Sequence, residues 1–403
     1  MGKEILLKIM DQPCFLIILS KEMNSLFGVM VKKKEIIFTS MILIILFLVV
    51  IEGGARAHEF FNAPCDFIDT EPMKKIDYFS LRQICSDFNL IAYENSAITL
   101  IAPNQNYPTI NINSDSFRGS EIQEIKSESH YRIFVIGGST IFGAGSTSDE
   151  TTIPALLQKR FNELEQDFDI EVVNAGIVSA NSISEKFYIE NYLLEFNPDL
   201  LIIYDGWNDS EDRILDEKLV IDEENNNKSF LKFQNFPYYR TPFVIYDILN
   251  SQNQEKTYPQ ENDDKTEQLI SSWSSRWDTI CKSGIENNYK TILTVQPIVG
   301  SGNKILTAEE KTFLSETKIH SEVINTINGM GDALSEIKSC NKTLDLRNVF
   351  ENINEQVYVD RGHLSDFGNK IIADQLFNLS LPTVLDDLQN SSSGYLIQEK
   401  IRD

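Results

Sequence analysis

Apolar and polar positions alternate along this chain in two different ways. Near the N-terminus, the segment Ile36–Ile51 is apolar apart from Thr39 and Ser40. As a helix it would extend about 24 Å, which is at the short limit for crossing a bilayer. From residue 132 onward, short apolar runs are separated by longer segments in which apolar residues recur with helical spacing. Short strands of this kind, separated by helices, predict a parallel sheet that is covered on both faces.

Turn-forming residues set the limits of the predicted elements: Gly137 and Gly138 follow the first strand, and Pro297 follows the fourth. Strands are predicted at 132–136, 170–173, 200–204, 291–295 and 343–346. Helices are predicted at 78–87, 152–164, 182–196, 264–288, 308–339 and 366–379, the fifth with a break near Gly329. Extended segments are expected at 97–102 and 109–113, and fraying at 390–403. The pattern predicts a three-layer α/β/α sandwich around a parallel five-stranded sheet.

The run at 36–52 is interpreted as a transmembrane signal anchor. Lys32, Lys33 and Lys34 precede it, and lysines on this flank favour a cytoplasmic N-terminus with the rest of the chain exported. A cleaved signal peptide, with Ala55-Arg56-Ala57 as the processing site, is the alternative. A buried core helix is the third interpretation. The first 30 residues could also be an upstream extension, with Met23 or Met30 as the start.

These patterns divide the chain into consecutive regions. We expect a cytoplasmic segment at 1–35, the anchor at 36–52, an extracytoplasmic pre-domain segment at 53–130, a folded α/β domain at 131–385 and a C-terminal tail at 386–403. An insertion at about 211–263 interrupts the domain. It is acidic and irregular, but it contains the aromatic cluster Phe236–Tyr246. We predict that this cluster borders the ligand-binding crevice of the domain as a lid or as a pocket wall.

Charge and cysteine content narrow the possible functions. The chain carries 36 basic and 60 acidic side chains, a net charge of −24. Such an acidic surface repels nucleic acids, so no nucleic-acid partner is expected. Of five cysteines, Cys14 would be cytoplasmic, whereas Cys65, Cys85, Cys281 and Cys340 would be exported. These four could stay reduced or form disulfides in three connectivities, with Cys65–Cys85 the simplest pair. No spacing of cysteine and histidine indicates a metal, and no cofactor is expected.

Residues with catalytic potential follow the predicted strands. Ser139 comes after the first strand, Asn174-Ala175-Gly176 after the second and Gly206-Trp207-Asn208-Asp209 after the third. Asp360-Arg361-Gly362-His363 precedes the last helix. Ligands of doubly wound sheets bind beyond the carboxyl ends of the strands, so these groups are expected to meet. A dinucleotide-binding turn at the glycines is the competing interpretation, but it requires an acidic residue where Asn174 stands.

With these residues the chain resembles the SGNH (GDSL-type) hydrolase superfamily. The family has four blocks, which read GGS at 137–139, NAG at 174–176, GWND at 206–209 and DRGH at 360–363 here. The resemblance extends from Arg132 to Phe377. The segment 113–119 also looks like one found before the nucleophile in anchored family members. One departure is Gly138, which stands where the family usually has aspartate.

The resemblance implies a flavodoxin-like fold and a role for each matching residue. Ser139 would be the nucleophile, His363 its general base and Asp360 the residue that orients the imidazole. The N–H groups of Ser139 and Gly176 and the side-chain amide of Asn208 would form the oxyanion hole. Asp209 is expected to be structural.

We therefore expect a membrane-anchored, extracytoplasmic serine esterase. It would hydrolyse oxygen esters of small molecules, glycans or lipids, with O-acetyl groups on sugars as the first candidates. An O-acyltransferase with the same triad is one alternative. A catalytically silent surface binding module is another, although binding alone would not require Ser139, Asn208, Asp360 and His363 together. The sequence does not indicate an oligomeric state.

Overall fold

The computed structural model describes residues 35–58, 67, 69–95, 98–123, 126–127, 130–164, 169–212, 241, 263–315 and 319–402. Two compact units are present: residues 1–59 with 239–248, and residues 60–238 with 249–403. Most of the insertion, including nearly all of the aromatic cluster at 236–246, lies outside the described residues, so its predicted position at the active site stays a prediction.

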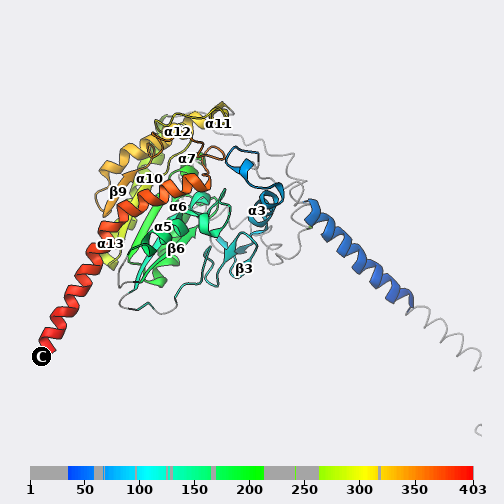
Figure 1. Ribbon diagram of the computed structural model, residues 1–403, viewed down its shortest axis with the longest axis horizontal. Coiled ribbons are helices and arrows are strands. Elements are labelled where there is room, and N and C mark those ends of the chain that lie inside the picture. Colours follow the sequence, from blue (N-terminus) through cyan, green and yellow to red (C-terminus); the bar gives the residue numbers. More distant parts are fainter. Residues whose placement is uncertain are drawn as a thin grey trace, which may run out of the picture. The chain divides into compact units, whose positions relative to one another are not determined.

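The second unit contains the predicted five-stranded parallel sheet, which confirms the expected fold class (Figure 1). Its strands are β5 (His130–Gly137), β6 (Asp169–Gly176), β7 (Leu200–Asp205), β8 (Lys290–Val295) and β9 (Lys342–Asp345). They lie in the order β6-β5-β7-β8-β9. The order reverses between β5 and β7, and this switch point is where open α/β sheets bind their ligands. The residues that follow β5 and β7 are therefore placed for chemistry.

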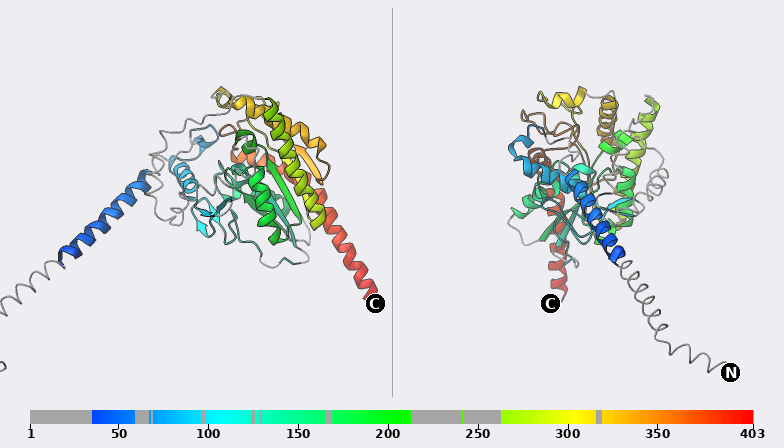
Figure 2. Two further views of the ribbon diagram at one scale, coloured as in Figure 1. Left: turned by 180° about the vertical axis from the view of Figure 1, so that it is seen from behind. Right: turned by 90° about the vertical axis from the view of Figure 1, so that its right-hand side faces the viewer.

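Helices cover both faces of the sheet (Figures 1 and 2). They are α4 (Ser139–Phe142), η2 (Asp149–Thr151), α5 (Ile153–Asn162), α6 (Ser182–Asn191), η3 (Leu193–Phe196), α7 (Trp207–Asp212), α10 (Asp263–Asn287), α11 (Glu310–Ser315), α12 (Ile319–Ala333), η4 (Leu334–Glu336) and α13 (Asp366–Arg402). Alternate residues of β5 point to opposite faces, as a period of two requires. Ile133 and Val135 join the core beneath α5 and α13, whereas Phe134 and Ile136 join the core beneath α6, α10 and α12. The sheet thus forms the middle of three layers.

Two helix predictions were wrong in their limits. The predicted break at Gly329 does not exist, because α12 passes through it; a Cβ at this position would strike Ile270 of α10, so the glycine permits close packing. The predicted end at residue 379 and the frayed tail are replaced by α13, which continues to Arg402 through Pro382 (Figure 1). Burial of Val384 and Leu388 in the core beneath α13 continues the helix beyond the proline.

The segment before the sheet packs against the end of α4. It contains η1 (Met73–Lys75), α3 (Tyr78–Leu90), the antiparallel pair β1 (Tyr93–Asn95) and β2 (Thr99–Ile101), and the pair β3 (Gln105–Asn106) and β4 (Asn111–Ile112). Apolar residues of this segment, including Ile101 and Ile112, surround Phe142 at the end of α4. The predicted boundary at residue 131 therefore separates two parts of one compact unit.

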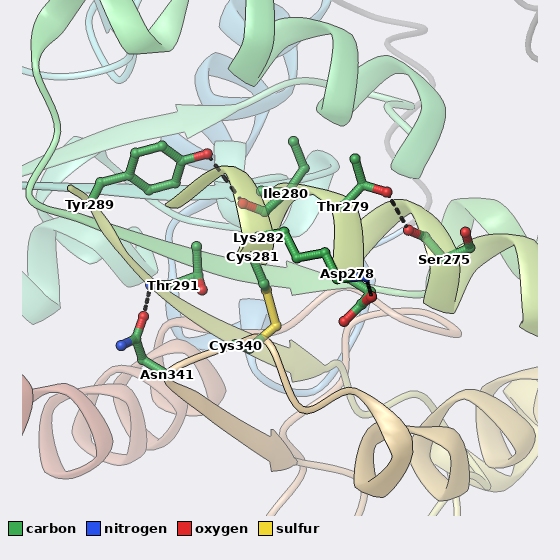
Figure 3. Close-up of a disulfide and its surroundings, with 10 residues drawn as sticks. All are labelled: Ser275, Asp278, Thr279, Ile280, Cys281, Lys282, Tyr289, Thr291, Cys340 and Asn341. Atoms are coloured by element: carbon green, nitrogen blue, oxygen red, sulfur yellow. Dashed lines mark hydrogen bonds and ion pairs between the residues drawn. A yellow bond between two sulfur atoms is a disulfide. The ribbon is translucent and has the colours of Figure 1, made fainter. Parts of the chain in front are cut away.

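A disulfide joins Cys281 of α10 to Cys340, just before β9 (Figure 3). The two cysteines are 59 residues apart, and closing a loop of this length stabilises a fold by about 4 kcal/mol in the chain-entropy account. Cys85 is also disulfide-bonded. Its predicted partner, Cys65, lies outside the described residues, so that pairing stays a prediction.

The first unit contains the helix Glu35–His58, which is longer than the predicted run at 36–52. This 24-residue helix has a mean hydropathy of 2.7, and its large apolar side chains from Ile36 to Val50 are exposed. At 1.5 Å per residue it extends about 36 Å, enough to cross a bilayer. A signal sequence would share these properties.

Candidate active site

The turn after β5 presents Ser139 at the start of α4. Gly138 is the N-cap of this helix, and a Cβ added there would strike the Asn208 side-chain amide. The family's usual aspartate could not stand at this position without moving Asn208. At the other end, Gly143 adopts a φ of 106°, which favours glycine, and its N–H donates to the carbonyl of Ser139. The short helix is thus fixed at both ends.

His363 reaches Ser139 from the loop before α13. Its Nε2 lies 2.7 Å from Ser139 Oγ, although the two residues are 224 positions apart. Its Nδ1 lies 2.5 Å from Asp360 Oδ2. An ionised carboxylate can only accept, so Nδ1 carries the proton and Nε2 is left to accept the serine O–H. The structure therefore brings together the three residues predicted to form a triad.

Asp360 is held in its ionised form by its partners. Its Oδ1 accepts hydrogen bonds from the backbone N–H groups of Gly362, at 2.8 Å, and His363, at 2.7 Å. Burial alone raises the pKa of this carboxyl, but the charge and hydrogen bond of His363 and the two N–H donors outweigh it. The pKa of Asp360 falls to about 2. Asp360 is therefore a carboxylate at any pH at which the protein is expected to work.

The pKa of His363 moves in the other direction. Burial lowers it, but the charge and hydrogen bond of Asp360, together with the charge of Glu211, outweigh burial and raise it. The imidazole thus remains protonated to a higher pH than a free histidine does. Since only the neutral ring can accept the serine proton, this shift sets the lower pH limit for any chemistry at Ser139.

Two of the three predicted oxyanion-hole residues, Ser139 and Asn208, have an N–H group available for a substrate oxygen. The N–H of Ser139, the first residue of α4, has no acceptor within the helix. The Nδ2 of Asn208 donates to the carbonyl of Ala180 at 2.6 Å, which leaves its second N–H for another acceptor.

Gly176 does not fit its predicted role as a donor. Its N–H donates to the side chain of Asn174 at 3.0 Å. A Cβ at Gly176 would strike the backbone of Phe142, so the glycine allows α4 to lie against β6. Its role is close packing beneath the nucleophile turn, and the expectation that it supplies an oxyanion-hole N–H is corrected.

Arg118 supports the nucleophile turn from the segment at 113–119. Its Nη1 donates to the carbonyls of Phe142 and Gly143, both at 3.1 Å, at the C-terminus of α4. Its Nε donates to Asp149 at 2.7 Å, and the guanidinium is almost completely buried. The resemblance marked this segment, but no local signal in the sequence assigns Arg118 to the carbonyls of α4.

A buried polar cluster lies behind Asn208. The carboxylate of Asp209 accepts from the N–H of Ser182 at 2.7 Å and from the Oγ of Ser182 at 2.5 Å. Arg276 of α10 pairs with Asp209 at 3.2 Å and donates to Ser182 Oγ at 2.7 Å. Asp209 therefore fixes α6 and α10 to the turn that carries Asn208, in agreement with the expected structural role.

No family model matches the chain, and no curated protein matches it. Among solved structures, an acetyl xylan esterase, AlAXEase, is similar over 62% of this chain and 98% of its own, with 15% identity and a TM-score of 0.37. A lipolytic protein of the G-D-S-L family from Desulfitobacterium hafniense is similar over 61% of this chain and 98% of its own, with 16% identity and a TM-score of 0.36. A two-domain esterase active on acetylated mannans is similar over 65% and 50%, with 13% identity and a TM-score of 0.35.

Proposed function

We propose that this protein is a serine ester hydrolase of the SGNH type that acts on acyl oxygen esters. The observation that carries the proposal is the continuous hydrogen-bonded series Ser139 Oγ, His363 Nε2, His363 Nδ1 and Asp360 Oδ2. A serine that is hydrogen-bonded to a histidine, itself oriented by a carboxylate, is the arrangement that activates a hydroxyl for attack on a carbonyl.

The reaction follows from the positions of these groups. Ser139 Oγ attacks the carbonyl carbon of the ester while His363 Nε2 takes the serine proton. The same proton passes to the leaving alcohol as the tetrahedral intermediate collapses to an acyl-Ser139 ester. Water, deprotonated by His363, then attacks the acyl carbon of this ester. As the second tetrahedral intermediate collapses, the bond to Ser139 Oγ breaks, the imidazolium returns its proton to Oγ, and the carboxylic acid leaves. Asp360 stabilises the imidazolium that forms in both steps.

The oxyanion would be stabilised by the N–H of Ser139, the free N–H of the Asn208 amide and the N–H of Ser179. We assign Ser179 in place of Gly176 because the turn Ile177–Ala180 borders the site. Asn208 donates to the carbonyl of Ala180, and a Cβ on Gly138 would lie 3.4 Å from that same oxygen. Ser179 is exposed, with a φ of 62°. Removing one of three donors should cost roughly 10²–10³ in kcat, so Asn208→Ala should retain measurable activity.

We also propose that the catalytic unit faces an oxidising, extracytoplasmic compartment. The apolar helix Glu35–His58 and the lysines at 32–34 support an anchor with a cytoplasmic N-terminus. The disulfide Cys281–Cys340 supports it independently, because such bonds persist outside the reducing cytoplasm. Protease added to intact cells should remove the catalytic unit, and a unit that stays protected until the membrane is broken would reverse the orientation. O-acetyl groups on surface glycans or lipids are the proposed substrates.

A panel of acyl esters tests the function. The full-length protein in detergent should hydrolyse p-nitrophenyl acetate, whereas Ser139→Ala should not. Assays with and without added sugars, whose hydroxyls can accept the acyl group, separate hydrolysis from transfer. Release of the carboxylic acid in the absence of an added sugar supports a hydrolase. Turnover only when an acceptor is present would instead establish the O-acyltransferase.

A further inference from the structure

Three residues beside His363 form a closed set of contacts that the triad itself does not require. Trp207 lies next to the histidine, with ring centroids 6.4 Å apart and planes inclined by 34°. Arg361, from the loop that carries His363, places its guanidinium 5.7 Å from the centroid of Trp207. Glu211, one turn after Trp207 on α7, receives a hydrogen bond from the Trp207 indole at 2.9 Å and pairs with Arg361 at 3.1 Å.

The absence of a side chain at Gly362 makes these contacts possible. A Cβ at this position would strike the six-membered ring of Trp207, so the indole lies directly against the backbone next to His363. Two segments that are 150 residues apart, α7 and the histidine loop, are therefore joined by one ion pair and one aromatic contact. The same helix carries Asn208, so the joint connects the oxyanion side of the site to the base.

We infer that Trp207, Glu211 and Arg361 form a positioning unit that holds the histidine loop against α7 and sets the electrostatic environment of the His363 imidazole. This inference rests on the proposed function. The charged groups that face His363 are Asp360 and Arg361 from its own loop and Glu211 from α7, while Ser139 faces it from α4 as a neutral partner.

The two charges of the unit act on His363 with opposite sign. Burial and Asp360 have the largest effects on the pKa of His363. Of the two smaller effects, that of Glu211 raises the pKa and that of Arg361 lowers it. Since the two groups form an ion pair, they partly cancel in the intact protein. Neutralising one leaves the other uncompensated, so the two single variants should move the titration of His363 in opposite directions. Loss of packing alone would not produce opposite shifts.

The test is the pH profile of kcat/KM for p-nitrophenyl acetate, measured with the full-length protein in detergent. Glu211→Gln should move the acidic limb to lower pH by roughly half a unit, and Arg361→Gln should move it to higher pH by a similar amount. Glu195→Gln is the matched control. It removes the same charge from an exposed residue of η3, which precedes β7 and so lies near the opposite end of that strand, and it should leave the limb in place.

Trp207→Phe separates positioning from charge. It keeps an aromatic ring beside His363 but removes the indole donor to Glu211, so it should lower kcat several-fold while leaving KM nearly unchanged. The inference would be overturned if the acidic limbs of both charge variants stay within about 0.1 pH unit of the wild type. It would also be overturned if both limbs move in the same direction.

NMR of the histidine ring distinguishes failure of this inference from failure of the proposed function. In the Ser139→Ala protein with labelled histidine, the imidazole of His363 can be titrated directly, whether or not the protein is an esterase. Opposite shifts in the Glu211→Gln and Arg361→Gln backgrounds support the unit even if no ester is hydrolysed. Unmoved titrations reject it even if the wild type is active.

Discussion

Asp360 and a group of three carboxyls behind Asn208 lie at the same edge of the sheet, yet their ionisation differs. The side chain of Asp360 keeps 29% of its surface exposed. Asp360 has a cationic partner and two backbone donors, and these lower its pKa to about 2 against the effect of burial. Behind Asn208, Glu185, Asp205 and Asp209 are almost inaccessible to solvent. Burial and the charge of Asp209 raise the pKa of Asp205 to about 7, although the indoles of Trp273 and Trp277 donate to it. Burial, together with the charges of Asp205 and Asp209, raises the pKa of Glu185 further above its usual range.

The difference shows that partners, and not burial alone, decide whether a carboxyl is charged. Among the basic side chains that the structure describes, Arg276 is the one that pairs with a carboxylate of this cluster, Asp209. Within the described part of the chain, neither side-chain oxygen of Glu185 has a hydrogen-bond partner. Asp360 is therefore a charged group suited to catalysis, whereas the cluster at Asn208 is a partly protonated framework for the turn.

The largest expected effect is a loss of kcat when Asp360, the proposed triad carboxylate, loses its charge. Asp360→Asn keeps the shape of the side chain but lets an amide face Nδ1, which favours the wrong imidazole tautomer. We expect kcat to fall by about 10³–10⁴, with KM little changed. Steady-state kinetics on p-nitrophenyl acetate measure this. A variant that retains more than a tenth of the wild-type kcat would show that the charge of Asp360 is not used.

The next largest effect is on the free energy of unfolding, at Asp209, which forms an ion pair with Arg276. Asp209→Asn leaves Arg276 as a buried cation without its carboxylate, and breaking such a pair costs about 3–5 kcal/mol. Denaturant unfolding of the full-length protein should show this loss, and the double variant Asp209→Asn/Arg276→Met should recover part of it. If the single variant is as stable as the wild type, the pair does not hold α6 and α10 to the turn.

A smaller effect of opposite sign is expected at Glu185. Glu185→Met removes an unpartnered carboxyl and should stabilise the protein by about 1–2 kcal/mol at pH 8. The pKa of Glu185 is higher in the folded chain than its unfolded value of 4.5, so the unfolded chain releases this proton first as the pH rises. Wild-type stability should therefore fall with rising pH above 4.5, and the gain of the variant should shrink at lower pH.

Unfolding curves between pH 4 and pH 8 check the sign of this dependence. Glu195→Met is the control, because it makes the same change at an exposed position of η3. A gain that is constant across this range, or one that grows toward low pH, contradicts a protonated Glu185 in the folded state.

The sequence predicts the sheet well because the central strands β5 and β7 contain the apolar runs 133–136 and 200–204, and short apolar runs bounded by turn residues are typical of buried parallel strands. It also indicates Ser139, Asp360 and His363, since each belongs to a short motif at the end of an element. Contacts between distant segments have no such signal. The ion pair Arg361–Glu211 and the bonds from Arg118 to α4 both depend on how the elements pack. The predicted helix end at residue 379 was wrong because burial of Val384 and Leu388 continues α13 past Pro382, despite the low helix propensity of proline.

The central claim is that His363 activates Ser139 as a nucleophile, and covalent labelling with a fluorophosphonate tests it most directly. The full-length protein should be labelled once, and peptide mass spectrometry should place the adduct on Ser139. His363→Ala should label several orders of magnitude more slowly, and Ser139→Ala not at all, because the two residues act as one unit. Labelling at another residue, or a Ser139→Ala protein that keeps its esterase activity, would contradict the account.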